Sequence, residues 1–168
     1  MGLNRALRDG KPLTDRYKTI QAGLDSWLSD APKEKGVFFR GIPMRANSEW
    51  NAVNTGDVIT DKAYTSFSKS REVAKGYGTN GIADDSVVIV ARGKLPELPM
   101  HISNRYGRKL YEAYREASEH LAPRNTQYRV TKVRDIKERY AVSTATGIAQ
   151  RSSTGNHIRN IRVVYVEF

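Results

Sequence analysis

"YREASEHLAPRNTQYRV", residues 114 to 130, joins two acidic residues to a turn and a β-strand. Glu116 and Glu119 stand close together, Pro123 to Asn125 predict a turn, and the residues from Thr126 alternate between polar and apolar. An isolated Glu pair beside a turn is usually a solvated acidic face. A chemical role for one of these carboxylates requires partners from other parts of the chain.

The flanking sequence predicts helices first and strands afterwards. Residues 3–8 predict a short helix, and Thr14 can cap a second helix that continues to Asp30. Strands are predicted at residues 36–43, 63–70, 86–93, 98–103, 126–136 and 158–168, and short helices at 48–54 and 71–78. This order indicates an α+β fold and not alternating βαβ units.

The composition is that of one globular domain. With 168 residues and 39% apolar content, the chain can bury a core. No run approaches the roughly 18 apolar residues of a membrane helix, and no secretory signal precedes the first predicted helix. Because there are no cysteines and only three histidines, we expect no metal site.

The net charge of +10 is concentrated late in the chain. From Asn104 onward there are 13 Lys and Arg residues against 6 Asp and Glu residues. Such a basic half predicts a surface that approaches phosphate, in a nucleic acid or in a phosphorylated cofactor. A solubility surface, or a dock for an acidic protein, fits the charge equally well. The sequence has neither a Walker loop nor a Gly-x-Gly-x-x-Gly after a strand.

Three separated motifs carry residue types that one active site could use. Arg40 ends an apolar strand in "VFFRG", where a buried guanidinium needs a partner or an anion. Ser66 and Ser68 alternate along "YTSFS", so both hydroxyls lie on one side of a strand. Glu119 precedes the turn into the strand from Thr126. For each motif alone, a structural role is the commoner explanation.

In this order and at these spacings, the motifs resemble the mono-ADP-ribosyltransferases of the Arg–Ser–Glu group, of bacterial toxin or phage type. That family has an aromatic-Arg-Gly strand end, then an aromatic-x-Ser-Thr-Ser strand, then a Glu before a turn and a strand. "LNRALR", residues 3–8, also resembles the family's opening helix. The resemblance implies N-terminal helices followed by a two-sheet β core. It implies one catalytic domain over residues 1–168, with a helical segment at 1–35 and a β-rich core at 36–168.

The resemblance also implies NAD as the substrate and no metal. Release of nicotinamide passes through an oxocarbenium-like transition state, which a fixed carboxylate stabilises. Glu119 is then expected to hold the ribose 2′-hydroxyl and to stabilise this cation, with Ser66 orienting Glu119 and Arg40 holding the diphosphate or ribose. The other expected cofactor contacts are Ser68, the Gly41 backbone at the nicotinamide amide, Phe67 or Tyr77 against its ring, and Asn4 and Arg8 at the phosphates.

Two positions depart from the family pattern. Phe67 replaces the Thr of Ser-Thr-Ser, and Ala117 stands where arginine-modifying members have the first Glu of Glu-x-Glu. The missing carboxylate puts arginine in doubt as the acceptor. Three explanations of Ala117 fit the sequence: a natural departure, an engineered change, or a role that Glu116 has taken over.

Basic and aromatic residues around Glu119 favour RNA slightly as the acceptor, because such mixtures contact phosphates and stack bases. The expected acceptor contacts are Tyr114, Arg115, Glu116 and Arg124. A protein side chain such as arginine, or water in an NAD glycohydrolase, is an alternative that uses the same site. A non-enzymatic, basic nucleic-acid-binding domain is the alternative from a different class.

The small size and the lack of a targeting signal fit either a phage-type enzyme or a toxin or effector module, and we expect it to act in the cytoplasm. If it is a toxin module, we expect delivery into a target cell as part of a larger secreted protein. An acidic immunity or inhibitor protein is then the expected protein partner, and no membrane is expected to bind.

Overall fold

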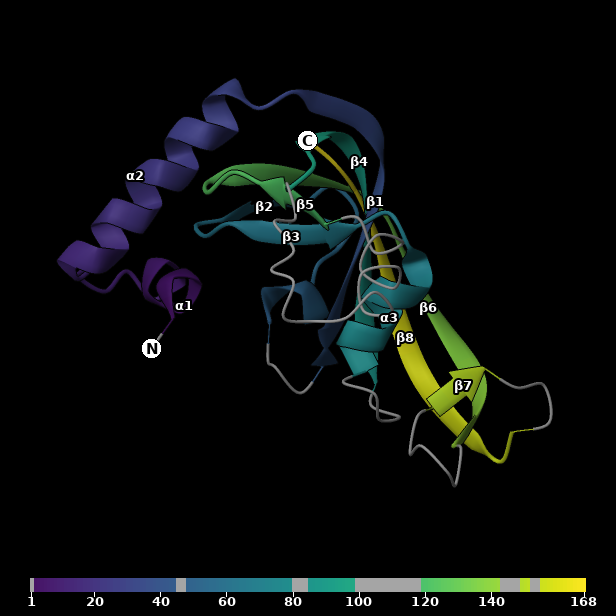
Figure 1. The fold of residues 1–168 in the computed structure, drawn as a ribbon. Coiled ribbons are helices and arrows are strands. Elements are labelled where there is room, and N and C mark those ends of the chain that lie inside the picture. The colour runs from purple at the N-terminus through teal and green to yellow at the C-terminus, as the bar shows by residue number, and fades with distance from the viewer. Residues whose placement is uncertain (1, 45–47, 80–84, 99–118, 143–148, 152–154) are drawn as a thin grey trace, which may run out of the picture.

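Two helices precede the sheet in the computed structural model, which describes residues 2–44, 48–79, 85–98, 119–142, 149–151 and 155–168. Helix α1 (Leu3–Arg8) is short, and α2 (Asp15–Asp30) is long. Thr14 caps α2 by accepting a hydrogen bond from the Tyr17 amide at 3.3 Å, and Pro32 follows its end. Both helices lie on the same side of the sheet (Figure 1). No helix among the described residues is long and apolar enough to cross a membrane.

The remaining described elements are mostly strands. The strands are β1 (Lys33–Pro43), β2 (Val58–Asp61), β3 (Thr65–Ser68), β4 (Ser86–Pro96), β5 (Glu119–Ala122), β6 (Thr126–Val142), β7 (Ala149–Arg151) and β8 (His157–Glu167). A short 3₁₀ helix, η2 (Glu49–Asn51), and α3 (Arg71–Thr79) lie between strands in the chain. The helix-plus-sheet class predicted from the sequence is confirmed in this form.

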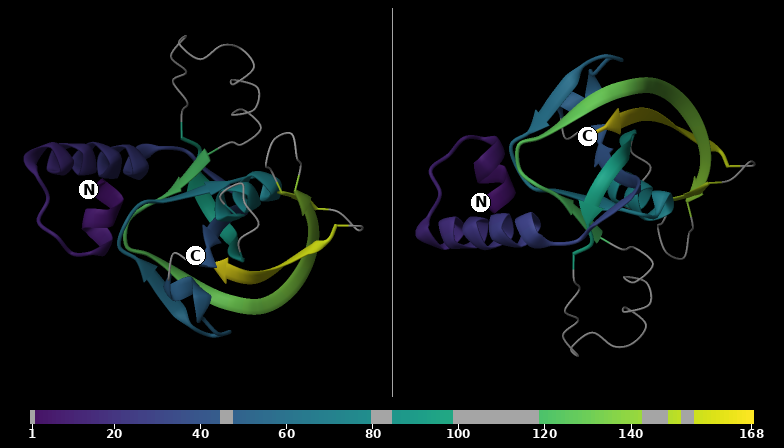
Figure 2. Two further views of the ribbon diagram at one scale, coloured as in Figure 1. Left: turned by 90° about the horizontal axis from the view of Figure 1, so that it is seen from below. Right: turned by 90° about the horizontal axis from the view of Figure 1, so that it is seen from above.

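All described strands are connected by hydrogen bonds into one sheet, in the order β2-β6-β8-β4-β1-β3-β5, with β7 on β6. The sheet is mixed, because β4 and β8 run parallel while β1 and β4 run antiparallel. Two separate sheets were expected, and this expectation is not confirmed. The physical reason is β6, which pairs first with β2 and then with β8 and changes register between Val130 and Lys132. Figure 2 shows β6 as a wide arc that bends the sheet around on itself.

The main core fills the inside of this bend. Phe38, Phe67, Tyr128 and Val164 belong to one buried cluster, with Trp50 at its margin. A second cluster packs α1 and α2 against the sheet, where Leu28 of α2 contacts Tyr64 and Leu121. The opening helices are therefore held close to the edge formed by β3 and β5.

Two of the short strands that were not predicted, β2 and β5, bear on the site. Glu119 was expected in a loop, but it is the first residue of β5, which pairs with β3. β2 ends at Asp61, four residues before β3 begins at Thr65. Of the strand predicted at 98–103, only Leu98 is described, and it lies outside the strands.

Candidate functional site

Arg40 lies on β1 and follows Phe39, which is directly opposite Ser68 on β3. Its Nη1 donates a hydrogen bond to the Ser66 carbonyl on β3 at 2.9 Å. Burial lowers the pKa of the Arg40 guanidinium, and the positive charge of Arg8 lowers it further, while Asp61, Tyr128 and Glu119 act in the opposite direction. The guanidinium is thus half-buried among groups from four separate stretches of the chain, where an anionic ligand would be favoured.

The two serines and Glu119 lie on neighbouring strands. In the β3–β5 pair Ser68 is directly opposite Glu119, and Ser66 is opposite Leu121. Residues directly opposite one another share a face of the sheet, and so do residues two apart on one strand. Both serines therefore lie on the face of Glu119, with Ser68 as its direct neighbour and Ser66 as a diagonal one. The Ser68 hydroxyl also accepts a hydrogen bond from the Ser70 amide at 2.9 Å.

Helix α1 reaches the same region through two polar side chains. Arg8 forms a two-point ion pair with Asp61, through Nε at 3.0 Å and Nη2 at 2.9 Å. Asn4 accepts a hydrogen bond from the Tyr64 amide through Oδ1 at 3.2 Å. The oxygen of Asn4 therefore fastens α1 to the chain just before β3, which leaves its amide nitrogen as the group that could contact a phosphate.

Phe67, a predicted cofactor contact, is separated from this group. Phe67 is 3% exposed and packs in the core against Tyr128 and Phe168, with ring centroids 6.1 and 6.5 Å apart. It does not line the site, because its side chain points to the opposite face from its neighbours Ser66 and Ser68. Gly41 follows Arg40 on β1, and Tyr77 lies on α3.

Arg124, predicted as an acceptor contact, is held by α2. Its Nε donates to Asp25 Oδ2 at 3.0 Å, and Asp25 also accepts from the Tyr64 hydroxyl at 2.7 Å. A guanidinium engaged in this way braces α2 against the turn after β5. Tyr114, Arg115, Glu116 and Ala117 lie outside the described residues.

Asp61 and Tyr128 are site residues that the sequence reasoning missed. Asp61 is 8% exposed; burial alone would raise its pKa, but hydrogen bonds from Arg8 and Thr65 outweigh this and hold it below its ordinary value. Burial raises the pKa of Tyr128 to about 12, although the side chains of Thr65 and Thr126 act in the opposite direction. A lone carboxylate before a strand was the only available signal for Asp61, and Tyr128 was counted only among the aromatic residues around Glu119 that could stack on bases.

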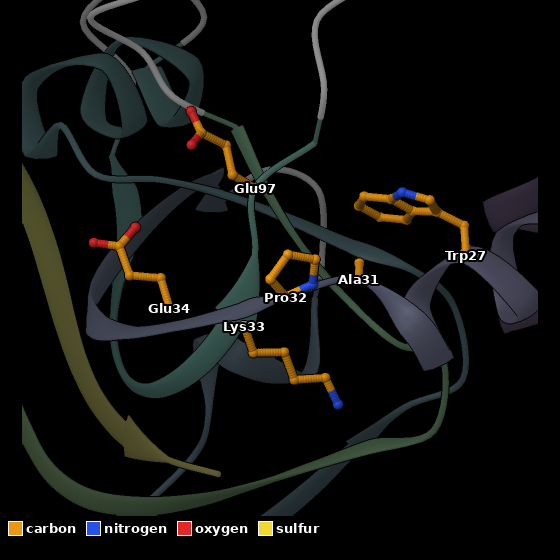
Figure 3. Close-up of a pocket in the computed structure, with 6 residues that line it drawn as sticks. All are labelled: Trp27, Ala31, Pro32, Lys33, Glu34 and Glu97. Carbon is orange, nitrogen blue, oxygen red and sulfur yellow. The ribbon is translucent and has the colours of Figure 1, made fainter.

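A cavity of about 570 Å³ opens at the junction of α2, β1 and the end of β4. Figure 3 shows the Trp27 indole on one side and the carboxylates of Glu34 and Glu97 on the other. Glu34 already binds Lys69, with 2.6 Å between Oε2 and Nζ. None of the predicted site residues lines this cavity. The described residues include no cluster of three or more His, Asp or Glu that could hold a metal ion.

No protein-family model matches this sequence, and no curated protein is similar to it in sequence. Solved structures of bacterial ADP-ribosyltransferases do share its fold. Exoenzyme S from Pseudomonas aeruginosa, in complex with human 14-3-3 protein beta and carba-NAD, is 24% identical, with a TM-score of 0.57 over 97% of this chain and 64% of that chain. The chain thus spans slightly under two thirds of that structure.

Two further solved structures of bacterial ADP-ribosyltransferases share the fold of this chain. The ADP-ribosyltransferase Vis from Vibrio splendidus, in complex with agmatine, is 19% identical, with a TM-score of 0.59 over 99% of this chain and 68% of that one. C3larvin toxin from Paenibacillus larvae is 16% identical, with a TM-score of 0.53 over 98% and 79%. The resemblance first carried by four short motifs is therefore confirmed at the level of the fold.

Proposed function

We propose that this chain, which has the fold of the bacterial mono-ADP-ribosyltransferase toxins, is itself an NAD-dependent mono-ADP-ribosyltransferase. One observation carries the proposal. The sheet order places β1, β3 and β5 side by side, so that Arg40, the serine pair and Glu119 come from three adjacent strands. The whole chain then acts as one catalytic domain, as the sequence suggested.

The charges at this site suit the diphosphate of NAD. Two guanidinium groups, of Arg8 and Arg40, lie near Asp61, and Glu119 also acts on Arg40, so the attraction for an anion comes from the two guanidinium groups and not from a net positive charge of the whole group. Arg40 keeps one Nη1 bond to the Ser66 carbonyl, so its remaining donors are available in a fixed orientation. A guanidinium that is half-buried without a full set of partners is a good match for a charged ligand.

The reaction needs a carboxylate that stabilises positive charge and not a general acid, because nicotinamide leaves as a neutral molecule. The bond between ribose C1′ and the nicotinamide nitrogen breaks, and its electron pair leaves with neutral nicotinamide. Positive charge develops on the ribose, where Glu119 stabilises it, with Ser66 and Ser68 on the same face. The acceptor then forms a bond to C1′ with its lone pair and releases a proton.

We infer RNA as the acceptor from the cations of β6. Their side chains are exposed and make no ion pair with any described residue; they are Arg129, Lys132, Arg134, Lys137 and Arg139. Unpaired cations along a strand fit a phosphate backbone better than they fit a peptide. A hydroxyl acceptor, such as a ribose 2′-OH, also needs no carboxylate at position 117.

A guanidino acceptor is the second candidate. Vis, which shares the fold, has been solved with agmatine, which carries a guanidino group. In this chain that acceptor would require another carboxylate to replace Ala117. Ala117→Glu should create or raise labelling of arginine-rich protein if the position is equivalent to that of arginine-modifying enzymes.

The deciding experiment incubates the chain with labelled NAD and a whole-cell lysate, which is then divided between RNase and protease. We expect label that RNase removes and protease does not, and none with Glu119→Gln. Protease-sensitive label would select the protein acceptor, and nicotinamide release without any label would select the glycohydrolase. No nicotinamide release and no NAD-induced rise in melting temperature would select the nucleic-acid-binding domain. As a toxin module, the enzyme would act in the target cell's cytoplasm and be blocked by an acidic immunity protein.

A further inference from the structure

Asp61, the last residue of β2, joins α1 to the strands of the site. Its Oδ1 and Oδ2 accept hydrogen bonds from Arg8, at 3.0 Å from Nε and 2.9 Å from Nη2. Thr65 Oγ1 donates to Oδ2 at 2.6 Å, and the Ala63 amide donates to Oδ1 at 3.0 Å. The carboxylate is thus held by the chain on one side, while it holds the guanidinium of Arg8 on the other.

This ion pair uses only one edge of the Arg8 guanidinium. Asp61 takes Nε–H and one hydrogen of Nη2, which leaves both hydrogens of Nη1 and the second hydrogen of Nη2 for another acceptor. The Arg8 side chain is 41% exposed, so these hydrogens are accessible. A planar fork fixed along one edge presents its other edge in a defined direction, which a freely rotating side chain cannot do.

The same residue also fixes the turn that follows Glu119's strand. The Asp61 carbonyl accepts a hydrogen bond from the Asn125 amide at 2.7 Å. Asn125 has a φ of 62°, a left-handed conformation that Asn tolerates better than most residues. Thr65, the donor to Asp61, pairs with Ala122 of β5. Arg8 is therefore tied, through one residue, to the strand that carries Glu119.

A carboxylate in this place could act in two opposite ways. If it only neutralised charge, it would compete with an anionic ligand for Arg8, and its removal would strengthen binding. If it orients the guanidinium, its removal would weaken binding, because Arg8 would lose its direction and would also be repelled by Arg40. The two hydrogen bonds from Thr65 and the Ala63 amide fix the carboxylate independently of Arg8, and this favours orientation.

We propose that Asp61 is a positioning residue that orients Arg8 toward the diphosphate of NAD. The inference rests on the proposed function, since it assumes that NAD is the ligand. It adds a residue to the site that none of the sequence motifs contained.

The test compares Asp61→Asn with wild type by nicotinamide release in the absence of an acceptor. Asn keeps the shape of the side chain but removes its charge. We expect the KM for NAD to rise about tenfold, with kcat within about threefold, because a ground-state contact is lost. Arg8→Lys should raise the KM for NAD to the same extent as Asp61→Asn, since an ammonium keeps the positive charge but lacks the planar fork of a guanidinium. The double variant should be no worse than either single one, because the two residues act as a unit.

Glu138→Gln is the matched control, because Glu138 also pairs with a guanidinium, that of Arg159, on β6 and β8 away from these strands. It should lower the melting temperature without changing the KM for NAD. If Asp61→Asn does not fold, Thr65→Val removes one support of the carboxylate, and we expect a KM increase of about threefold.

The positioning role is overturned if the KM for NAD is unchanged or lower in Asp61→Asn, or in Thr65→Val where that variant is used instead. The proposed function is still supported in that case, provided that the wild-type chain releases nicotinamide. Additive effects of Asp61→Asn and Arg8→Lys overturn the positioning role as well. A wild-type chain that neither releases nicotinamide nor is stabilised by NAD overturns the proposed function first, and the positioning role with it.

Discussion

Ser68 lies directly opposite Glu119 across the β3–β5 pair, and this pairing places the Glu119 carboxylate on a strand and not on a loop. A strand position restricts the backbone on which the carboxylate stands, because β3 hydrogen-bonds to one side of β5. Leu98 supports the other side, where its amide donates to the Glu119 carbonyl at 2.8 Å. Glu119 is therefore held before any ligand binds, as electrostatic stabilisation of a transition state requires.

Glu119→Gln should lower kcat by at least about a hundredfold while changing the KM for NAD by less than about threefold. The amide keeps the shape and cannot stabilise a developing cation. Ser66→Ala should lower kcat in the same direction by a smaller factor. Steady-state nicotinamide release measures both. Retention of more than half of wild-type turnover by Glu119→Gln would remove Glu119 from the mechanism.

Arg40→Lys should raise the KM for NAD strongly, because one ammonium cannot both bond the Ser66 carbonyl and present a planar fork to a diphosphate. Isothermal titration with NAD measures the loss without relying on turnover. Arg92→Lys, an exposed change on β4, is the control and should leave affinity unchanged. Equal affinities for NAD in Arg40→Lys and wild type would show that Arg40 is purely structural.

If RNA is the acceptor, its labelling should fall steeply between about 50 and 200 mM salt, since phosphate contacts release counterions. Nicotinamide release without RNA should change far less. Arg134→Glu with Lys137→Glu should reproduce the high-salt effect at low salt, whereas Lys18→Glu on α2 should not. If Lys18→Glu lowers RNA labelling as much as the double charge reversal on β6, the total charge of the protein matters and not the cations of β6.

Arg124→Glu is expected to differ from these reversals, because it would place a carboxylate against Asp25. We expect a lower melting temperature, caused by loss of the brace between α2 and the β5–β6 turn. Thermal denaturation measures this directly. If Arg124→Glu is as stable as wild type but labels RNA poorly, Arg124 contacts the acceptor, as the sequence predicted.

Glu138 should support stability in a pH-dependent way. It bonds Lys75 and Arg159, which are 8% and 3% exposed. Burial alone would raise the pKa of Glu138, but the hydrogen bonds from Lys75 and Arg159 outweigh it and lower the pKa. A lowered folded-state pKa gives stability that is present above the ordinary value of 4.5 and is lost as pH falls through the lowered one.

Glu138→Gln should therefore cost about 3 kcal/mol near pH 7, because two buried cations lose their partner. The difference from wild type should shrink as the pH falls well below 4. Urea denaturation at several pH values measures it. A difference that is independent of pH would assign the effect to packing.

The sequence predicted the elements whose signals are local. The apolar run from Val87 to Ala91 predicted β4, and the cap at Thr14 predicted the start of α2. β2 and β5 were missed because each has only four residues and, unlike β3, does not lie within a longer alternating run. In β5, His120 weakens the apolar signal further: it is fully buried against Phe38, with ring centroids 4.7 Å apart, although His is only intermediate in its tendency to be buried.

The residues of the site were predictable as types, but their relationships were not. Arg40, Ser66 and Glu119 could be chosen from motif order. The pairing of Arg8 with Asp61, 53 residues away, and that of Arg124 with Asp25, 99 residues away, depend on how α1 and α2 pack on the sheet. No local pattern encodes such a contact, because each partner is an ordinary surface charge within its own segment.

The position of β8 constrains when the fold can form. β8 lies between β6 and β4, although it is the last described strand of the chain. Until it has been synthesised, β2 and β6 have no hydrogen-bonded link to β4, β1, β3 and β5. A nascent chain that lacks β8 therefore has its strands in two groups with no hydrogen-bonded link between them, and Glu119 and Arg40 lie on only one of these groups. Completion of the sheet should therefore wait for β8, and it should be slow, because its central pairings join residues far apart in the chain.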